Sequence, residues 1–203
     1  MKRRLIFIPS ILSVSLVVLS ALWYFDNHRA HGGADSESAG EAVTIGGPFS
    51  LTDQNGVART EKDYRGKYLL LFFGYTYCPD VCPTTLAVMS AALDKLGSVA
   101  DRIVPILITV DPKRDTPEKL KSYLASFGPR FVGLTGESRD IAAVAKEYRV
   151  YYKEHPAENE GGYTVDHSGV VYLMDPNGAF LANYSLDTTP DAMAVDLSKK
   201  TRR

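Results

Sequence analysis

A continuous apolar segment constrains the fold of this chain more than any other feature. Residues 67–75 read KYLLLFFGY, with no alternation of polar and apolar side chains. A strand with one solvated face alternates, whereas a strand buried on both faces does not. Burial of both faces requires other elements to cover the sheet on each side. The segment therefore predicts an α/β protein whose sheet lies between layers of helices.

The segments around this run alternate between strand and helix patterns. We predict helices over residues 84–96, 116–127 and 138–148 and from Thr189 onward, and strands over 49–52, 67–75, 103–110, 131–134, 169–175 and 179–184. Pro105 indicates that the first residues of its strand are unpaired or at an edge, and the polar stretch 153–165 is predicted to be a loop. A βαβ unit followed by a hairpin and a terminal helix is the order of a thioredoxin-like fold with a mixed central sheet.

The N-terminus predicts the compartment. Three cations, Lys2, Arg3 and Arg4, precede the uncharged run 5–25, LIFIPSILSVSLVVLSALWYF. A membrane-spanning helix needs about 20 residues, and cations before it favour a cytoplasmic N-terminus. A cleaved signal peptide is the alternative, but its apolar core is usually only about 7–15 residues. We therefore expect residues 1–25 to be a basic cytoplasmic end and a single transmembrane anchor.

The residues after the anchor complete the expected domain organisation. Residues 26–42 are small and polar and are predicted to be a flexible tether, and 43–203 the thioredoxin-like domain. Two tether histidines, His28 and His31, are better explained as solvated than as metal ligands. Residues 1–25 lack the Arg- and Ser-rich pattern of an organellar transit segment, so we expect a bacterial inner membrane and a periplasmic domain.

Composition excludes several classes of function. A formal net charge of −1 gives no support to a nucleic-acid binder, because such binding depends on neutralising phosphates. Two cysteines in the whole chain exclude a disulfide-rich scaffold and any four-thiolate metal site.

The two cysteines lie together where a predicted buried strand gives way to a helix, in the segment CPDVCP of residues 78–83. Pro83 suits the first helical position, which would place Cys82 at or near the N-cap, where the positive helix end lowers a thiol pKa. A plain structural disulfide is one interpretation, although a loop of three residues gains little from closure. A redox pair and a metal-binding pair are the others, and the spacing does not separate them.

His167 favours the metal-binding interpretation. It directly precedes the strand 169–175 and could approach the cysteines from across the site. Two thiolates and one imidazole suit three-coordinate Cu(I) and could also hold Cu(II), whereas zinc would require a fourth ligand. The alternative for a lone histidine is a hydrogen-bonding loop residue.

Four segments carry a resemblance to a known family, in the order FGYTYCPDVCP at 73–83, ITVDPKRDTPE at 108–118, DHS at 166–168 and VYLMDPNG at 171–178. With them the chain resembles the Sco/SenC family of membrane-anchored, thioredoxin-like copper proteins that serve cytochrome c oxidase assembly. The resemblance implies that Cys78 and Cys82 bind copper and can form a reversible disulfide, and that His167 is the third ligand. Asp80 matches a motif acid that tunes the thiols or faces a partner. Many relatives carry His at the position of Tyr77. The segment 111–117 is shared too, but a strand end and a helix cap account for Asp111, Thr116 and Pro117, to which we assign no chemical role.

The resemblance leads to two hypotheses. The first is a copper metallochaperone that receives copper from a periplasmic donor and assists assembly of the CuA site of cytochrome c oxidase subunit II. The second is an anchored thiol–disulfide reductase that keeps the cysteines of subunit II reduced. The main role is expected to be non-enzymatic, with oxidoreductase activity left open. A thiol peroxidase is disfavoured because Pro79 stands where such enzymes place Thr, and a passive scaffold because the cysteine pair is reactive.

Overall fold

The computed structural model describes residues 23–24, 44–156 and 162–201. The chain divides into two units, Met1–Val43 and Thr44–Arg203. The predicted anchor and tether, with His28 and His31, lie outside the described residues apart from Trp23 and Tyr24. Within the part of the chain that is described, no helix combines the length and apolar character needed to cross a membrane.

The second unit contains all of the described strands. These are β1 (Ser50–Asp53), β2 (Ala58–Thr60), β3 (Tyr68–Gly74), β4 (Ile103–Thr109), β5 (Val132–Thr135), β6 (Tyr152–Pro156), β7 (Tyr163–His167), β8 (Val171–Met174) and β9 (Phe180–Tyr184). The α-helices are α2 (Val81–Lys95), α3 (Pro117–Leu124), α4 (Ser138–Glu147) and α5 (Pro190–Lys200). Short 3₁₀ helices span Glu61–Tyr64, Gly97–Arg102 and Ala125–Phe127.

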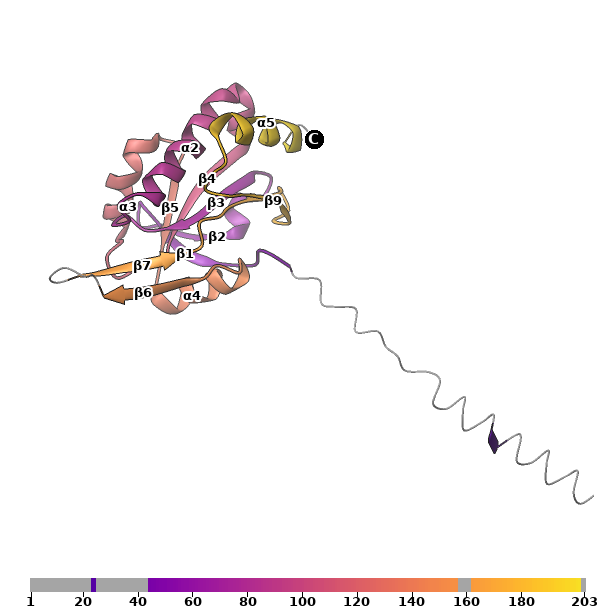
Figure 1. The fold of residues 1–203 in the computed structure, drawn as a ribbon, viewed down its shortest axis with the longest axis horizontal. Coiled ribbons are helices and arrows are strands. Elements are labelled where there is room, and N and C mark those ends of the chain that lie inside the picture. The colour runs from indigo at the N-terminus through magenta and orange to yellow at the C-terminus, as the bar shows by residue number, and fades with distance from the viewer. Residues whose placement is uncertain (1–22, 25–43, 157–161, 202–203) are drawn as a thin grey trace, which may run out of the picture. The chain divides into compact units, whose positions relative to one another are not determined.

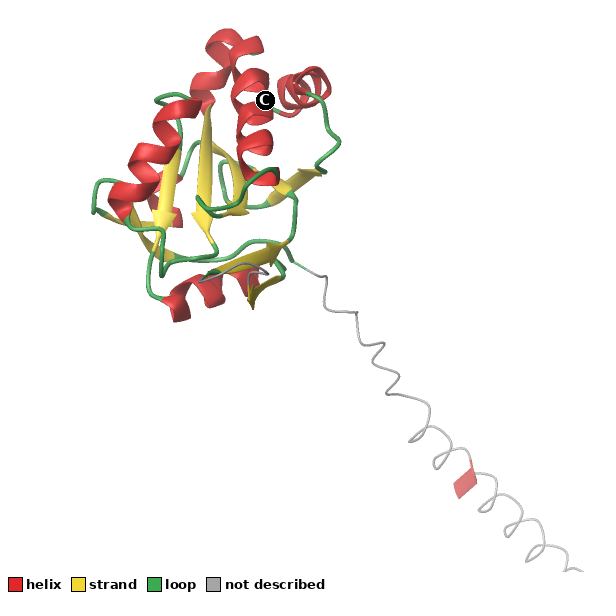
Figure 2. Cartoon of the chain, turned by 60° about the vertical axis from the view of Figure 1, so that its left-hand side comes forward, coloured by secondary structure: helices red, strands yellow, loops and turns green. Residues whose placement is uncertain are grey.

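The main sheet is mixed and has the order β2-β1-β5-β4-β3-β8-β9. β3 pairs in parallel with β4 and antiparallel with β8, and β4 pairs in parallel with β5. Helices α2, α3 and α5 lie on one side of the sheet and α4 on the other (Figures 1 and 2). The prediction of a thioredoxin-like fold with a mixed, helix-covered sheet is confirmed.

The core forms around β3, as its unbroken apolar run predicts. Every residue of this strand is buried, because the strand has a neighbour on each edge and helices over each face. On the α2 side, the core receives Leu86, Met89 and Leu93, which recur at helical spacing. On the α4 side, the ring of Phe73 packs against that of Tyr148, 5.4 Å between centroids.

The Pro105 prediction is confirmed on one edge of its strand. Ile103–Pro105 pair with β3, but pairing with β5 begins only at Ile106. Proline, which lacks a main-chain donor, is therefore accommodated before the second ladder starts.

The predicted loop over 153–165 is wrong. Most of that stretch belongs to β6 and β7, which pair antiparallel as a separate two-stranded sheet, with Tyr152 opposite His167. The burial pattern of β6 has no fully buried position, so its sequence carries no amphipathic signal. The hairpin is instead held by contacts with a segment far away in the sequence, which single-sequence periodicity does not report.

Candidate metal centre

The three predicted site residues come from two places in the fold. Cys78 lies in the loop between β3 and α2, Cys82 lies in the first turn of α2, and His167 is the last residue of β7. Their donor atoms all lie within 4.8 Å of one another, and this is the one such group of three or more His, Cys, Asp or Glu among the described residues. The structure thus brings together all three residues that the sequence singled out.

The glycine at the end of β3 allows Cys82 to approach the strand. A Cβ atom at Gly74 would lie 2.9 Å from the Cys82 sulfur, closer than real side chains come. The loop that follows is fixed from below by Asp115. The Asp115 carboxylate accepts hydrogen bonds from the main-chain N–H and the hydroxyl of Thr76, at 3.0 and 2.6 Å.

The orientation of His167 directs one ring nitrogen at the sulfurs. Its Nε2 lies 3.3 Å from Cys82 Sγ, and its Nδ1 lies 3.3 Å from the carbonyl oxygen of Ser168. A carbonyl can only accept, so the tautomer with its proton on Nδ1 suits this contact, and that tautomer directs the Nε2 lone pair at the sulfurs as a metal ligand requires. The ring meets those of Phe72 and Tyr75 edge to face, at 5.7 and 5.9 Å between centroids.

Cys82 lies near the N-cap of α2, as expected, but Pro83 is the third helical residue and not the first. Helix α2 begins at Val81 with Asp80 as its N-cap, so Cys82 is the second helical residue and not the cap. Its main-chain N–H therefore points back to Cys78 Sγ, at 3.4 Å. The amide at the positive end of the helix consequently stabilises charge on Cys78 and not on Cys82.

The pKa values of the two thiols separate accordingly. The hydrogen bond from the Cys82 thiol, assisted by main-chain N–H groups of Cys82 and Asp80, lowers the pKa of Cys78 to about 5. The hydrogen bond to Cys78 and complete burial raise the pKa of Cys82. Both cysteines are free thiols, and Cys78 is the more exposed. The expectation that the helix end lowers the pKa of Cys82 is therefore wrong, because the lowered pKa belongs to Cys78.

Asp80 and His155 lie outside this group. The Asp80 side chain is exposed and accepts a 3.5 Å bond from the Thr84 hydroxyl. His155, on β6, places its Nε2 3.1 Å from an Asp166 oxygen. Neither side chain is directed at the two sulfurs as a further donor in the described arrangement.

Sequence reasoning did not identify the groups that surround the centre. The β4–α3 loop, residues 110–116, contributes Asp115 below the cysteine loop, and Asp111 and Arg114 beside the hairpin. In the segment 111–117, Asp111, Thr116 and Pro117 were interpreted as a strand end and a helix cap, and Thr116 does cap α3. Its repeated charged residues between a buried strand and that cap were the signal of a further role.

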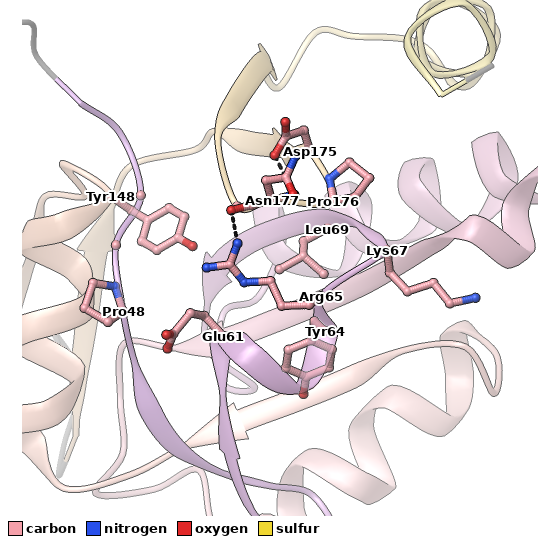
Figure 3. Close-up of a pocket in the computed structure, with 13 residues that line it drawn as sticks. Pro48, Glu61, Tyr64, Arg65, Lys67, Leu69, Tyr148, Asp175, Pro176 and Asn177 are labelled. Atoms are coloured by element: carbon pink, nitrogen blue, oxygen red, sulfur yellow. Dashed lines mark hydrogen bonds between the residues drawn. The ribbon is translucent and has the colours of Figure 1, made fainter. Parts of the chain in front are cut away.

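A hollow at the other end of β3 offers no comparable chemistry. It is lined by residues from the start of β3, from the β8–β9 turn and from the 3₁₀ helix at 61–64 (Figure 3). Arg65 donates to the main-chain oxygen of Asn177 there, and Glu61 and Tyr148 border the same space. No cysteine or histidine lines it, whereas Cys78, Cys82 and His167 lie at the opposite end of β3.

Comparisons with known proteins give a consistent result. A family model described as SCO1/SenC matches residues 37–202. The mitochondrial SCO1 homolog of Homo sapiens is 40% identical over 160 residues, which cover 78% of this chain and 53% of that protein. An SCO2-like protein of Rickettsia conorii is 43% identical over 152 residues, 74% of each chain. The chain spans about half the length of the human protein and of a mitochondrial relative from Arabidopsis thaliana.

Solved structures agree with the sequence relatives. Bradyrhizobium japonicum ScoI with copper bound is 51% identical, covers 76% of this chain and 98% of its own, and has a TM-score of 0.71. Arabidopsis thaliana ScoI with copper bound is 42% identical, covers 78% and 98%, and has a TM-score of 0.74. These copper-bound structures support copper as the metal to consider for the Cys–Cys–His group.

Proposed function

The chain belongs to the SCO1/SenC family, and from that premise we propose that it is a copper metallochaperone. It holds one copper through Cys78, Cys82 and His167. It passes that copper to the CuA site of cytochrome c oxidase subunit II. The copper is cargo in this function, received from a periplasmic donor and released to the oxidase.

One observation carries the proposal: two sulfurs and one imidazole nitrogen share a space of metal-site dimensions. Metal–ligand bonds of about 2.0–2.3 Å place the donors of a trigonal three-coordinate ion about 3.5–4.0 Å apart. The donor atoms of this chain lie within 4.8 Å of one another, so closing around an ion needs movements of at most about 1 Å. Soft thiolates select Cu(I), and the absence of a fourth donor in the described group disfavours zinc.

The unequal burial of the ligands sets a direction for copper transfer. Cys82 is fully buried, whereas Cys78 and His167 are each partly exposed. An incoming thiolate of subunit II therefore reaches the metal from the side of Cys78 and His167 and displaces those ligands before Cys82. Because every ligand must be deprotonated, copper affinity falls as pH drops.

A Cu(I) competition titration tests the site. The reduced full-length chain in detergent is titrated against a coloured Cu(I) chelator, beside His167→Ala and a Cys78→Ser/Cys82→Ser double variant. We expect one copper per chain, weaker binding in His167→Ala and none in the double variant. His155→Ala is the matched control, because His155 lies on the same hairpin but outside the group. Unchanged Cu(I) affinity in His167→Ala would refute the three-ligand site.

The thiol arrangement also supports the second candidate, a thiol–disulfide reductase. The Cys78 thiolate attacks a target disulfide and releases one target thiolate, and Cys82 then attacks the mixed disulfide and releases the second. The target gains two electrons, and this chain ends with a Cys78–Cys82 disulfide that an external thiol reductant must reduce again. This role needs no His167. Retained reduction of an oxidised subunit II fragment by His167→Ala, with loss in Cys78→Ser, would support it.

We also propose the predicted topology for this function. The run 5–25 anchors the chain in a bacterial inner membrane, and 26–42 links it to a periplasmic domain. Copper acceptance and transfer then occur on the side of the membrane where an assembling CuA domain would be met.

A further inference from the structure

The hairpin that carries His167 is not part of the main sheet. Among the described residues, β6 and β7 pair only with each other. The main-chain N–H of buried Val165 donates to the hydroxyl of Tyr75, the residue just after β3, at 3.3 Å. The position of His167 over the cysteines therefore depends largely on side-chain contacts.

The β4–α3 loop supplies several of these contacts. Arg114 Nη1 donates to the carbonyl oxygen of Tyr163 at 2.9 Å, and its guanidinium carbon lies 3.7 Å from the centre of the Tyr163 ring. The Tyr163 hydroxyl donates to Asp111 at 2.6 Å. Lys113 and Glu154 add an exposed ion pair at 2.7 Å. Both strands of the hairpin are thus tied to one loop.

The same guanidinium also reaches the segment before Cys78. It lies 4.7 Å from the centre of the Tyr77 ring and 5.7 Å from that of Tyr75. Its Nε donates to Asp111, whose side chain is fully buried. Arg114 therefore lies between the segment that leads to Cys78 and the strand that ends at His167, and it contacts both.

We propose that Arg114 is a positioning residue of the metal centre: it holds the β6–β7 hairpin against the cysteine loop and so keeps His167 within reach of the sulfurs. The proposal rests on the proposed copper-binding function. Groups that orient metal ligands without touching the metal typically change metal affinity by about 10–100-fold. Three aromatic rings and a buried carboxylate hold the guanidinium in place. Because these rings belong to the cysteine loop and to the hairpin, the guanidinium fixes the position of one relative to the other.

Arg114→Lys is the first variant. Lysine keeps a positive charge for buried Asp111, but it cannot make the Nε and Nη1 bonds together or cover the Tyr163 ring. We expect about a 10-fold loss of Cu(I) affinity in the full-length chain. In a His167→Ala background the same change should have no further effect, because the positioned ligand is already absent. With Cu(II), the nitrogen hyperfine lines of the His167 ligand should weaken in the electron paramagnetic resonance spectrum.

The matched control is Arg65→Lys. Arg65 also donates from Nη1 to a main-chain oxygen, that of Asn177, but it lies at the opposite end of β3. Its Cu(I) affinity and Cu(II) spectrum should equal those of the unmodified chain. If Arg114→Lys folds poorly, Tyr163→Phe removes only the hydroxyl bond to Asp111 and should weaken copper binding in the same His167-dependent way.

Amide hydrogen exchange on the copper-free chain tests the positioning without metal. We expect faster exchange at Val165 in Arg114→Lys and unchanged exchange at the β3 amides. Unchanged Val165 exchange, or a loss of copper affinity that persists in full when His167 is absent, would overturn the proposal. If His167→Ala weakens copper binding but Arg114→Lys does not, the positioning role fails while the proposed function stands. If His167→Ala binds Cu(I) as tightly as the unmodified chain, the three-ligand function itself fails.

Discussion

Cys78 and Cys82 differ in accessibility and in acidity, although one turn of chain separates them. The pKa of Cys78 is lowered to about 5 by the Cys82 thiol and by main-chain N–H groups, whereas the hydrogen bond to Cys78 and burial raise the pKa of Cys82. The thiolate is the reactive form. In the reduced, copper-free chain, iodoacetamide should therefore modify Cys78 at pH 7 and leave Cys82 unmodified.

The dependence of the Cys78 alkylation rate on pH tests this prediction. The alkylation rate of Cys78 should rise with pH, with a midpoint near 5, because the thiolate forms as pH passes the lowered pKa. Peptide mass spectrometry of timed samples between pH 4 and pH 9 measures it. In Cys82→Ser the principal hydrogen bond to the Cys78 sulfur is replaced, and the midpoint should move upward. A midpoint near the ordinary thiol value of about 8.5 in the unmodified chain would contradict the described arrangement.

Sequence alone identified the candidate ligands but not the residues that place them. Cys78 and Cys82 stand in one short motif, and His167 stands just before a recognisable strand. Arg114 and Tyr163, by contrast, meet across 49 positions of chain. Such a contact depends on which loops share an end of the sheet, and residue spacing does not contain that information. Helix α2 likewise begins at Val81, earlier than predicted, and the main-chain N–H of Cys82 in its first turn stabilises a thiolate on Cys78 and not on Cys82.

At the scale of the elements, apolar periodicity was sufficient to predict the core strands and helices, but it did not reveal the hairpin that is held by side-chain contacts. β3, α2 and α3 follow from apolar patterns and from the Thr116-Pro117 cap. The β6–β7 hairpin was missed because its strands are largely exposed and are stabilised by contacts from another loop. Elements of that kind have no signal of their own in a single sequence.

The junction between β3 and α2 allows a test of close packing. Gly74→Ala would place a Cβ 2.9 Å from both the Cys82 sulfur and the Phe72 ring. Overpacking of this kind costs about 1–3 kcal/mol of unfolding free energy. Because the sulfur must move, Cu(I) affinity should also fall. Urea unfolding and the chelator titration measure the two effects on the same preparations.

Gly133→Ala is the control for that substitution. Its Cβ would lie 2.7 Å from a Leu124 methyl carbon, in the core between β5 and α3 and away from the sulfurs. It should destabilise the chain to a similar degree and leave Cu(I) affinity unchanged. Equal losses of copper affinity in both variants would mean that stability, and not the position of Cys82, sets copper binding.

At the scale of the whole molecule, we expect the two units to have separable roles. The unit Thr44–Arg203 contains the whole sheet and all three members of the metal-binding group. A chain that begins at Thr44 should therefore bind Cu(I) as tightly as the full-length chain. The same titration compares them, and a weaker truncated chain would mean that residues 1–43 contribute to the site.

The first unit should determine where the molecule resides. Expressed in a bacterial host, the full-length chain should remain with membranes after alkaline carbonate extraction, because the 21-residue uncharged run 5–25 matches the roughly 20 residues that span a bilayer. Protease added to spheroplasts should degrade its domain, since Lys2, Arg3 and Arg4 favour retention of the N-terminus in the cytoplasm. The chain beginning at Thr44 should be soluble and protected inside the cell. Intact mass spectrometry distinguishes the anchor from a cleaved signal peptide. A protein shortened near residue 25 and released to the periplasm would show that the signal peptide is cleaved. Copper would then be carried by a freely diffusing domain.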